Sequence, residues 1–222
     1  MGWFGGYDVS EDVQDWIEAS FDWARMNGIF TPKTPLVLPT KEFFPAPSGD
    51  THQVVVGLVD NLKTILGLQG LDIALAPLND LPEELRHSYE TTSSVAGTWQ
   101  GDDAGGLISY DPGLINRPMT LISMLAHELM HQRLARSTGD WPGGAEAEEL
   151  ATDLHVITAG LGVIELAGAE QAGWQGYMRQ TSRAHALAVF LARRGMGAEA
   201  ALSYLPPRAA KFLKRSVKEL AR

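Results

Sequence analysis

The pattern His-Glu-x-x-His occurs once in this 222-residue chain, as His127, Glu128 and His131. On a helix, side chains four residues apart lie on one face, so both imidazoles can reach a single ion. Neutral imidazole nitrogen is a good zinc ligand. Glu128 directly follows the first histidine, which places its carboxylate where it can take a proton from metal-bound water. Chance produces about 0.01 such motifs in a chain of this composition, so the pattern favours a zinc centre over two solvated surface histidines.

The residues around the motif predict the helix that the motif requires. Apolar side chains recur at helical spacing through the segment 118–135 and give it a face to bury. These side chains are Leu121, Ile122, Leu125, Ala126 and Leu129. The chain has no cysteine, so zinc would have to be held by histidine and carboxylate alone.

A second helix, predicted from Glu146 to about Leu161, offers the carboxylates for a third ligand. Glu149 and Asp153 are four residues apart and share a face. One of them could bind the metal while the other accepts the second N–H of a ligating imidazole. The spacing leaves open which carboxylate does which.

Three neighbouring residues could compete for these roles. We interpret Glu146 and Glu148 as acids of the first helical turn, where the helix dipole favours negative charge. His155 is interpreted as a packed histidine, since a fourth protein ligand would close the site.

The two motifs together, His127-Glu128-x-x-His131 and Glu149-x-x-x-Asp153, resemble those of the glutamate-type zincin-like metallopeptidases (gluzincins), including uncharacterised bacterial members. The resemblance covers roughly residues 105–165. It implies that His127, His131 and Glu149 bind Zn²⁺, that Glu128 is the general base and that Asp153 orients a ligating histidine. It also implies an active-site helix under a small sheet whose edge strand pairs with an extended substrate, and Leu107–Tyr110 is the candidate edge.

We therefore expect one α+β domain of zincin-like form over residues 1–222, with an α+β part at 1–118 and a helical part at 119–222. The expected elements are helices at 11–27 and 51–66, strands at 71–76 and 105–110, and helices at 118–135, 146–161, 181–194 and around Pro206. Residues 77–105 are expected to be turn-rich, with a possible short helix at 82–86, and a Gly-rich break is expected from 162 to 176. The expected buried stripe of the helix 146–161 consists of Leu150, Ala151, Leu154, Ile157 and Leu161. The Pro-rich passage 30–47 is interpreted as an ordered, extended connection because Leu36 and Val37 need a core to bury them.

Charge is distributed unevenly along the chain. The net charge is −9, yet residues 179–222 hold ten basic and only two acidic residues. This segment also has regular apolar positions, so we expect a helix docked on the acidic remainder rather than an arm that binds nucleic acid. We expect no membrane span, because the longest apolar stretch, 156–169, is short and contains Glu165. With no visible secretory signal, a cytoplasmic location is the simplest expectation.

The expected function is a zinc-dependent hydrolase acting on a peptide or protein. Its tetrahedral intermediate needs a second electrophile, for which His185 is the candidate catalytic residue, with Tyr177 and Arg183 nearby in the sequence. A packed helix histidine is an equally good interpretation of His185. The alternative function is a metal-stabilised binding or regulatory module without peptidase activity. The sequence does not predict the cleavage specificity or the oligomeric state.

Overall fold

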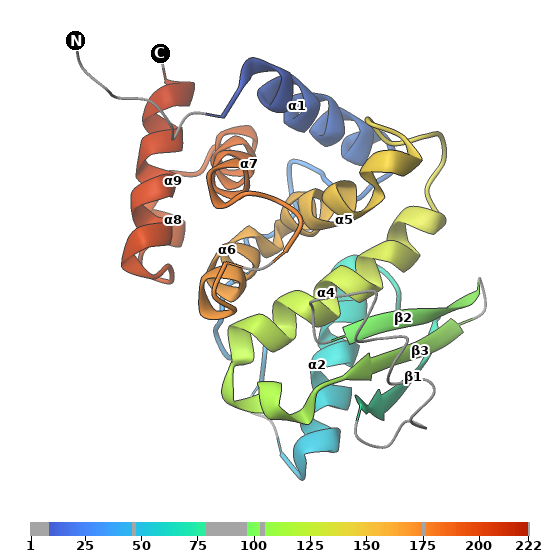
Figure 1. Cartoon of the computed structure of the whole chain (residues 1–222). Coiled ribbons are helices and arrows are strands. Elements are labelled where there is room, and N and C mark those ends of the chain that lie inside the picture. Colours follow the sequence, from blue (N-terminus) through green and yellow to red (C-terminus); the bar gives the residue numbers. More distant parts are fainter. Residues whose placement is uncertain (1–8, 46–47, 79–96, 103–104, 175, 222) are drawn as a thin grey trace.

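Helices dominate the structure, and one small sheet lies beside them (Figure 1). The computed structural model describes residues 9–45, 48–78, 97–102, 105–174 and 176–221. In chain order the elements are α1 (Glu11–Met26), α2 (Thr51–Leu66), β1 (Asp72–Pro77), β2 (Gly97–Asp102), β3 (Gly105–Tyr110), α4 (Pro118–Ala135), α5 (Glu148–Val156), α6 (Gly162–Gln171), α7 (Gln180–Arg193), α8 (Glu199–Leu202) and α9 (Pro207–Leu220). The prediction of the α+β class is confirmed.

The sheet has the strand order β1-β3-β2 within the described part of the chain. β1 pairs with β3 in parallel, and β2 pairs with β3 antiparallel, with Trp99 opposite Ile108. The expectation that Leu107–Tyr110 forms an edge is therefore wrong, because β3 is hydrogen-bonded on both sides. The edge that lies nearest α4 is β2 (Figure 1), which the sequence analysis had treated as turn. The short helix expected at 82–86 falls outside the described residues.

Helix α4, which carries the motif, is buried on most of its surface. Pro118 is its first residue, where proline is well tolerated because the N–H it lacks would have no helical partner. Gln171 of α6 caps the same end, since its side-chain oxygen accepts from the Thr120 N–H at 3.1 Å. α4 is thus fixed by tertiary contacts rather than by its own capping residue.

Gly160 interrupts the segment that runs from α5 to α6. Its φ of 97° is left-handed, and a Cβ there would lie 2.1 Å from the Pro35 carbonyl oxygen. The Val37 N–H donates to the Gly160 carbonyl at 2.9 Å, so the Pro-rich passage crosses the helix at this kink. Leu36 and Val37 are buried there, as predicted.

The expected Gly-rich break from 162 to 176 is wrong over most of its length, because α6 resumes at Gly162. Gly168 is needed for close packing of α6 on α4, since a Cβ there would lie 2.7 Å from the Ser123 Cβ. Among the residues expected to form a buried stripe on the preceding helix, Leu150 is exposed and the others, Ala151, Leu154, Ile157 and Leu161, are buried. The continuous helical stretch Ala145–Gln171 is long and apolar enough to cross a membrane, but 94% of its most apolar window is buried inside the molecule, as in a core helix.

α2 and the sheet pack against α4, whereas α1 packs against α5 and α7 (Figure 1). Arg193 of α7 binds Glu18 and Asp22 of α1 and so fixes this contact. The first helix therefore belongs with the C-terminal helices.

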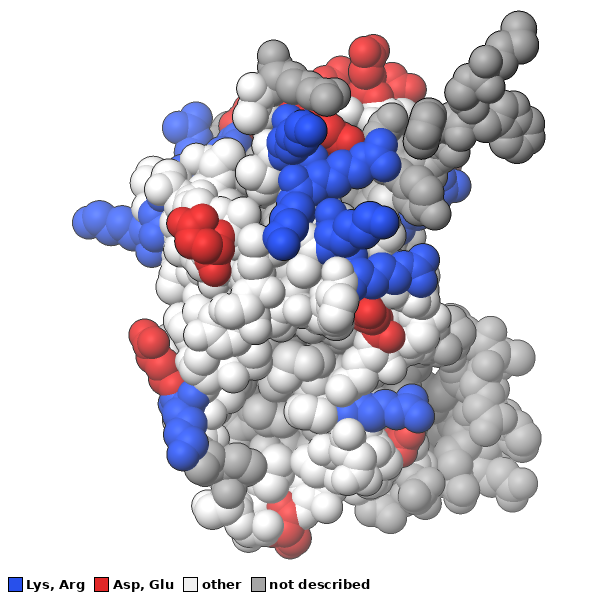
Figure 2. Space-filling model, turned by 90° about the vertical axis from the view of Figure 1, so that its left-hand side faces the viewer, with Lys and Arg blue, Asp and Glu red and all other residues white. Residues whose placement is uncertain are grey.

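Helix α9 docks on α7 through its apolar face, with Ala209 and Leu213 buried. Its cations point to solvent and form a basic surface (Figure 2), which includes Lys211, Lys214, Arg215 and Lys218. The tail is a docked helix, as expected, but burial of apolar side chains rather than attraction of its lysines to acidic groups holds it in place.

Candidate metal centre

His127 and His131 lie one turn apart on α4 and turn their rings toward one another. Their Nε2 atoms are 3.2 Å apart, and their ring planes are nearly perpendicular at 81°. Both rings are largely buried, because α4 is covered by α5 on this side. Because they are four residues apart, the two rings lie on one face of α4, as the sequence predicted.

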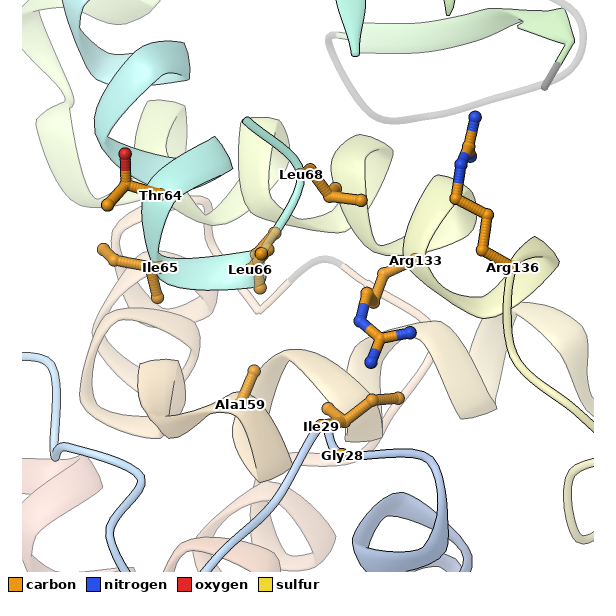
Figure 3. A pocket seen from close by; sticks show the side chains of 10 residues that line it. Gly28, Ile29, Thr64, Ile65, Leu66, Leu68, Arg133, Arg136 and Ala159 are labelled. Carbon is orange, nitrogen blue, oxygen red and sulfur yellow. The ribbon is translucent and has the colours of Figure 1, made fainter. Parts of the chain in front are cut away.

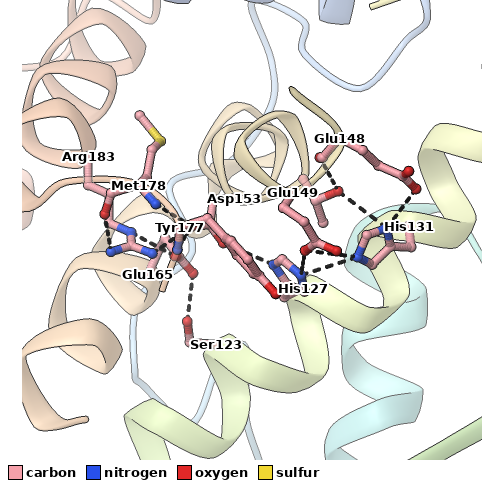
Figure 4. Close-up of polar contacts among 11 residues, drawn as sticks. Ser123, His127, His131, Glu148, Glu149, Asp153, Glu165, Tyr177, Met178 and Arg183 are labelled. Carbon is pink, nitrogen blue, oxygen red and sulfur yellow. Dashed lines mark hydrogen bonds and ion pairs between the residues drawn. The ribbon is translucent and has the colours of Figure 1, made fainter. Parts of the chain in front are cut away.

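Glu149, in the first turn of α5, completes the group (Figure 4). Its Oε2 atom is 3.1 Å from His127 Nε2 and 3.6 Å from His131 Nε2. The ligand atoms of the three residues all lie within 4.8 Å of one another. The sequence therefore predicted correctly which residues meet.

The three atoms are spaced as the donor set of a tetrahedral ion. Bonds of about 2.0–2.1 Å to nitrogen and oxygen put neighbouring ligand atoms of a tetrahedron about 3.3 Å apart. The observed separations of 3.1, 3.2 and 3.6 Å bracket that value. Two imidazoles and one carboxylate fit zinc, and they leave a fourth position open.

Asp153 binds the other nitrogen of His127. Its Oδ1 atom is 2.9 Å from Nδ1, so Nδ1–H is the donor, and Nε2 faces Glu149. Asp153 is not among the three convergent groups, so the structure does not support the alternative in which Asp153 is the ligand and Glu149 is merely solvated.

His131 is oriented more loosely. Its Nδ1 atom is 3.4 Å from Glu148 Oε1 and 3.4 Å from the Thr152 hydroxyl. Glu148, interpreted from the sequence as an acid of the first turn, thus also reaches a ligand. Glu146 is exposed in the 3-10 turn before α5 and takes no part.

The electrostatics of the group favour a cation. Burial lowers the pKa of His127, but the hydrogen bonds that its ring donates to the Asp153 and Glu149 carboxylates outweigh burial and raise it to about 10. The hydrogen bonds to His127 and His131 hold the pKa of Glu149 below its usual range. In the metal-free protein a proton occupies this position at neutral pH, and a divalent ion has to displace it.

Glu128 is buried beside the group, with 6% of its surface exposed. Its negative charge contributes to the raised pKa values of both His127 and Tyr177, so its carboxylate faces the same space. It is not one of the three convergent groups.

Tyr177 lies beside the candidate metal centre, and no sequence motif had identified it. Its ring stacks on His127, with centroids 5.8 Å apart and an angle of 17° between the planes (Figure 4). Burial raises the pKa of its hydroxyl, and the carboxylates of Glu149, Asp153 and Glu128 raise it further. The hydroxyl therefore stays protonated at neutral pH and can donate a hydrogen bond. The sequence named Tyr177 only as an alternative because the loop before α7 carries no recognisable motif.

His185, expected to be catalytic, is not brought to this group. It is buried in α7, and the acidic groups that act on it are Glu18 of α1 and Glu219 of α9. His185 is not one of the three convergent groups. The structure thus agrees with the interpretation of His185 as a packed histidine.

His155 is also a core residue, as expected. It is fully buried against Trp23, and its Nδ1 lies 3.1 Å from the Thr158 hydroxyl. Burial lowers its pKa to about 3. A neutral histidine in this position has no access to the metal centre.

A cavity of about 370 Å³ lies away from the metal ligands, where the ends of α1, α2 and α4 meet (Figure 3). Arg133 points into it and donates to the Asn27 carbonyl at 2.6 Å, so this guanidinium caps the C-terminus of α1. Arg136 also lines the cavity, and it donates to the Gln132 carbonyl at 2.9 Å (Figure 3). Arg133 is thus accounted for by helix capping.

Comparisons of the chain with protein-family models, with curated proteins and with solved structures gave no significant match. The motif and the geometry of its residues are therefore the observations that bear on the function of this chain.

Proposed function

We propose that this protein is a zinc-dependent peptidase of the gluzincin type, with a zincin-like fold. The observation that carries the proposal is the convergence of His127, His131 and Glu149 at tetrahedral spacing. Their second contacts add to it, because a carboxylate fixes the ligating tautomer of His127. A site that only stabilised the fold would need no buried Glu128 beside it.

His127, His131 and Glu149 would hold the zinc, which when bound would supply a Lewis acid and would lower the pKa of a coordinated water to about 7. Glu128 accepts the proton of the attacking water and passes it to the leaving amine, so its carboxylate ends the cycle ionised. The Tyr177 hydroxyl, protonated and beside His127, donates a hydrogen bond to the oxyanion of the tetrahedral intermediate. Asp153 keeps Nδ1 of His127 protonated throughout.

The sheet edge suggests a peptide as the substrate. β2 is the strand nearest α4, and within the described residues its outer side has no paired strand (Figure 1). An extended peptide can add to such an edge through main-chain hydrogen bonds. We therefore assign the substrate-binding role to β2, in place of Leu107–Tyr110.

The test is digestion of a peptide library with and without a chelator. We expect cleavage that the chelator abolishes and that added zinc restores. Glu128→Gln should retain zinc and lose cleavage by a factor of at least about 100, since general-base catalysis contributes that much. Glu146→Gln, at the exposed acid before α5, is the matched control and should cleave like the wild type. Full activity of Glu128→Gln contradicts the assigned base, and a library left intact under every condition favours the regulatory module.

A further inference from the structure

A fully buried arginine connects the metal centre to the loop that carries Tyr177 (Figure 4). Arg183 of α7 is 2% exposed. Its Nη2 donates to Asp153 Oδ2 at 2.6 Å, its Nε to Glu165 Oε1 at 2.9 Å and its Nη1 to the Met178 carbonyl at 2.6 Å. Each of its three nitrogens thus has a different partner.

The two oxygens of the Asp153 carboxylate have different partners: one binds the His127 ring, and the other binds the loop before α7. Oδ1 accepts from His127 Nδ1 at 2.9 Å. Oδ2 accepts from Arg183 and from the backbone N–H groups of Tyr177 and Met178, at 3.1 and 2.9 Å. The position of the Tyr177 backbone is therefore fixed by the same side chain that orients a metal ligand.

A second connection leads back to the motif helix. Ser123, one turn before His127 on α4, donates to Glu165 Oε2 at 2.6 Å. The other oxygen of Glu165 binds Arg183. The arginine is thus held between α4, α5 and α6, and its place does not depend on α7 alone.

The loop backbone itself lies against the guanidinium. Gly176 has a φ of 113°, and a Cβ there would lie 2.2 Å from Arg183 Nη2. Only glycine allows this approach. The arginine therefore determines the path of the loop as well as its hydrogen bonds.

We propose that Arg183 is a positioning residue, which holds the Tyr177 ring against His127 by binding the Asp153 carboxylate and the Met178 carbonyl together. Lysine could not replace it, because an ammonium group lacks the planar fork that reaches three partners in fixed directions. The effect on catalysis rests on the proposed function, whereas the effect on the position of Tyr177 requires only that the centre binds a metal.

The position of Tyr177 can be measured without any substrate. The full chain is produced with 3-fluorotyrosine, and Tyr177→Phe identifies the resonance of Tyr177 among the five tyrosines. Co²⁺ added at one equivalent should shift this resonance strongly in the wild type, because the ring stacks on a ligand. In Arg183→Lys the shift should fall to half or less while one Co²⁺ remains bound. Arg193→Lys, an arginine of the same helix that binds only α1 residues, is the control and should match the wild type.

Kinetics then test whether Arg183 acts through Tyr177. We expect Arg183→Lys to lower kcat about 10- to 100-fold with little change in KM, as for other residues that orient metal sites. The same change in a Tyr177→Phe background should lower kcat less than threefold further. If Arg183→Lys does not fold, Gly176→Ala displaces the loop without removing a buried charge and should reduce the Co²⁺ shift.

The outcomes separate the two proposals. An unchanged Tyr177 shift in the folded variant with Co²⁺ bound contradicts the role of Arg183 and leaves the hydrolase intact. Multiplicative losses in the double variant also contradict it. A wild type that binds no Co²⁺ contradicts the proposed metal centre itself.

Discussion

Glu149 and Asp153 are four residues apart and each has a carboxylate, yet the two carboxylates bind different nitrogens of His127. Glu149 is partly exposed and reaches Nε2, whereas Asp153 is buried and reaches Nδ1. The sequence shows that the two share a helix face but not which one lies nearer the ion. That choice depends on how far α5 is displaced along α4, which is a property of packing.

The proposed mechanism gives Tyr177 the role for which the sequence favoured His185. We predict that Tyr177→Phe lowers kcat about 10²-fold at unchanged zinc content, because one oxyanion donor contributes about that factor. His185→Asn should keep kcat within about twofold, since its ring faces α1 and α9. Steady-state kinetics with metal analysis measure both variants. A large kcat loss in His185→Asn with normal stability would restore the first assignment.

The lowered pKa of His155 predicts that the free energy of unfolding depends on pH. Its pKa is about 3 in the folded protein, against an ordinary value of 6.5. Between pH 6.5 and 3 the unfolded chain binds a proton that the folded protein excludes, so this contribution is complete above pH 6.5 and is lost as the pH falls. The slope approaches about 1.4 kcal/mol per pH unit.

The measurement is urea unfolding at pH 7, 6 and 5 with a chelator present, so that metal release does not contribute. His155→Phe fills a similar volume without titrating, and its free energy of unfolding should fall less steeply with acid than that of the wild type. Parallel curves for the two proteins would show that His155 does not titrate in this range.

Helices are the elements that the sequence predicts best. The bounds of α2 match the expectation, because Asp50 and Gly67 supply the capping signals at its two ends. β2 could not be predicted, since its sequence, Gly97–Asp102, has little apolar character and forms a strand only by pairing with β3. Glycines were misleading in α6, where they permit close helix packing and do not end the helix.

The docking of α9 on α7 gives a prediction about the stability that one helix contributes. Leu213 is fully buried where α9 packs on α7, so Leu213→Ala should lower the free energy of unfolding by about 2–5 kcal/mol. Lys214→Ala, at the next and exposed position, should change it by less than about 0.5 kcal/mol. Denaturant unfolding in low and high salt measures both. If high salt released α9 and Lys214→Ala were as damaging as Leu213→Ala, charge attraction would hold the helix.

At the scale of the whole molecule, the candidate metal centre lies between α4 and α5. α4 contacts α2 and β2 as well as α5 and α6, so it is the helix shared by the sheet and the C-terminal helices (Figure 1). A bound ion would cross-link α4 to α5 through His127 and Glu149. The sequence predicted which side chains share a helix face because their spacing is local, whereas the packing of other elements on α4 depends on long-range contacts that local patterns do not contain.

The most direct measurement is the zinc content of the purified protein after dialysis against zinc and then against zinc-free buffer. The wild type should retain one zinc per chain, and Glu146→Ala, at the exposed acid that contacts no ligand, should match it. Glu149→Ala should retain little or none, because two imidazoles alone hold the ion weakly. A full equivalent of zinc in Glu149→Ala, or none in the wild type, would contradict the assignment of the centre to His127, His131 and Glu149.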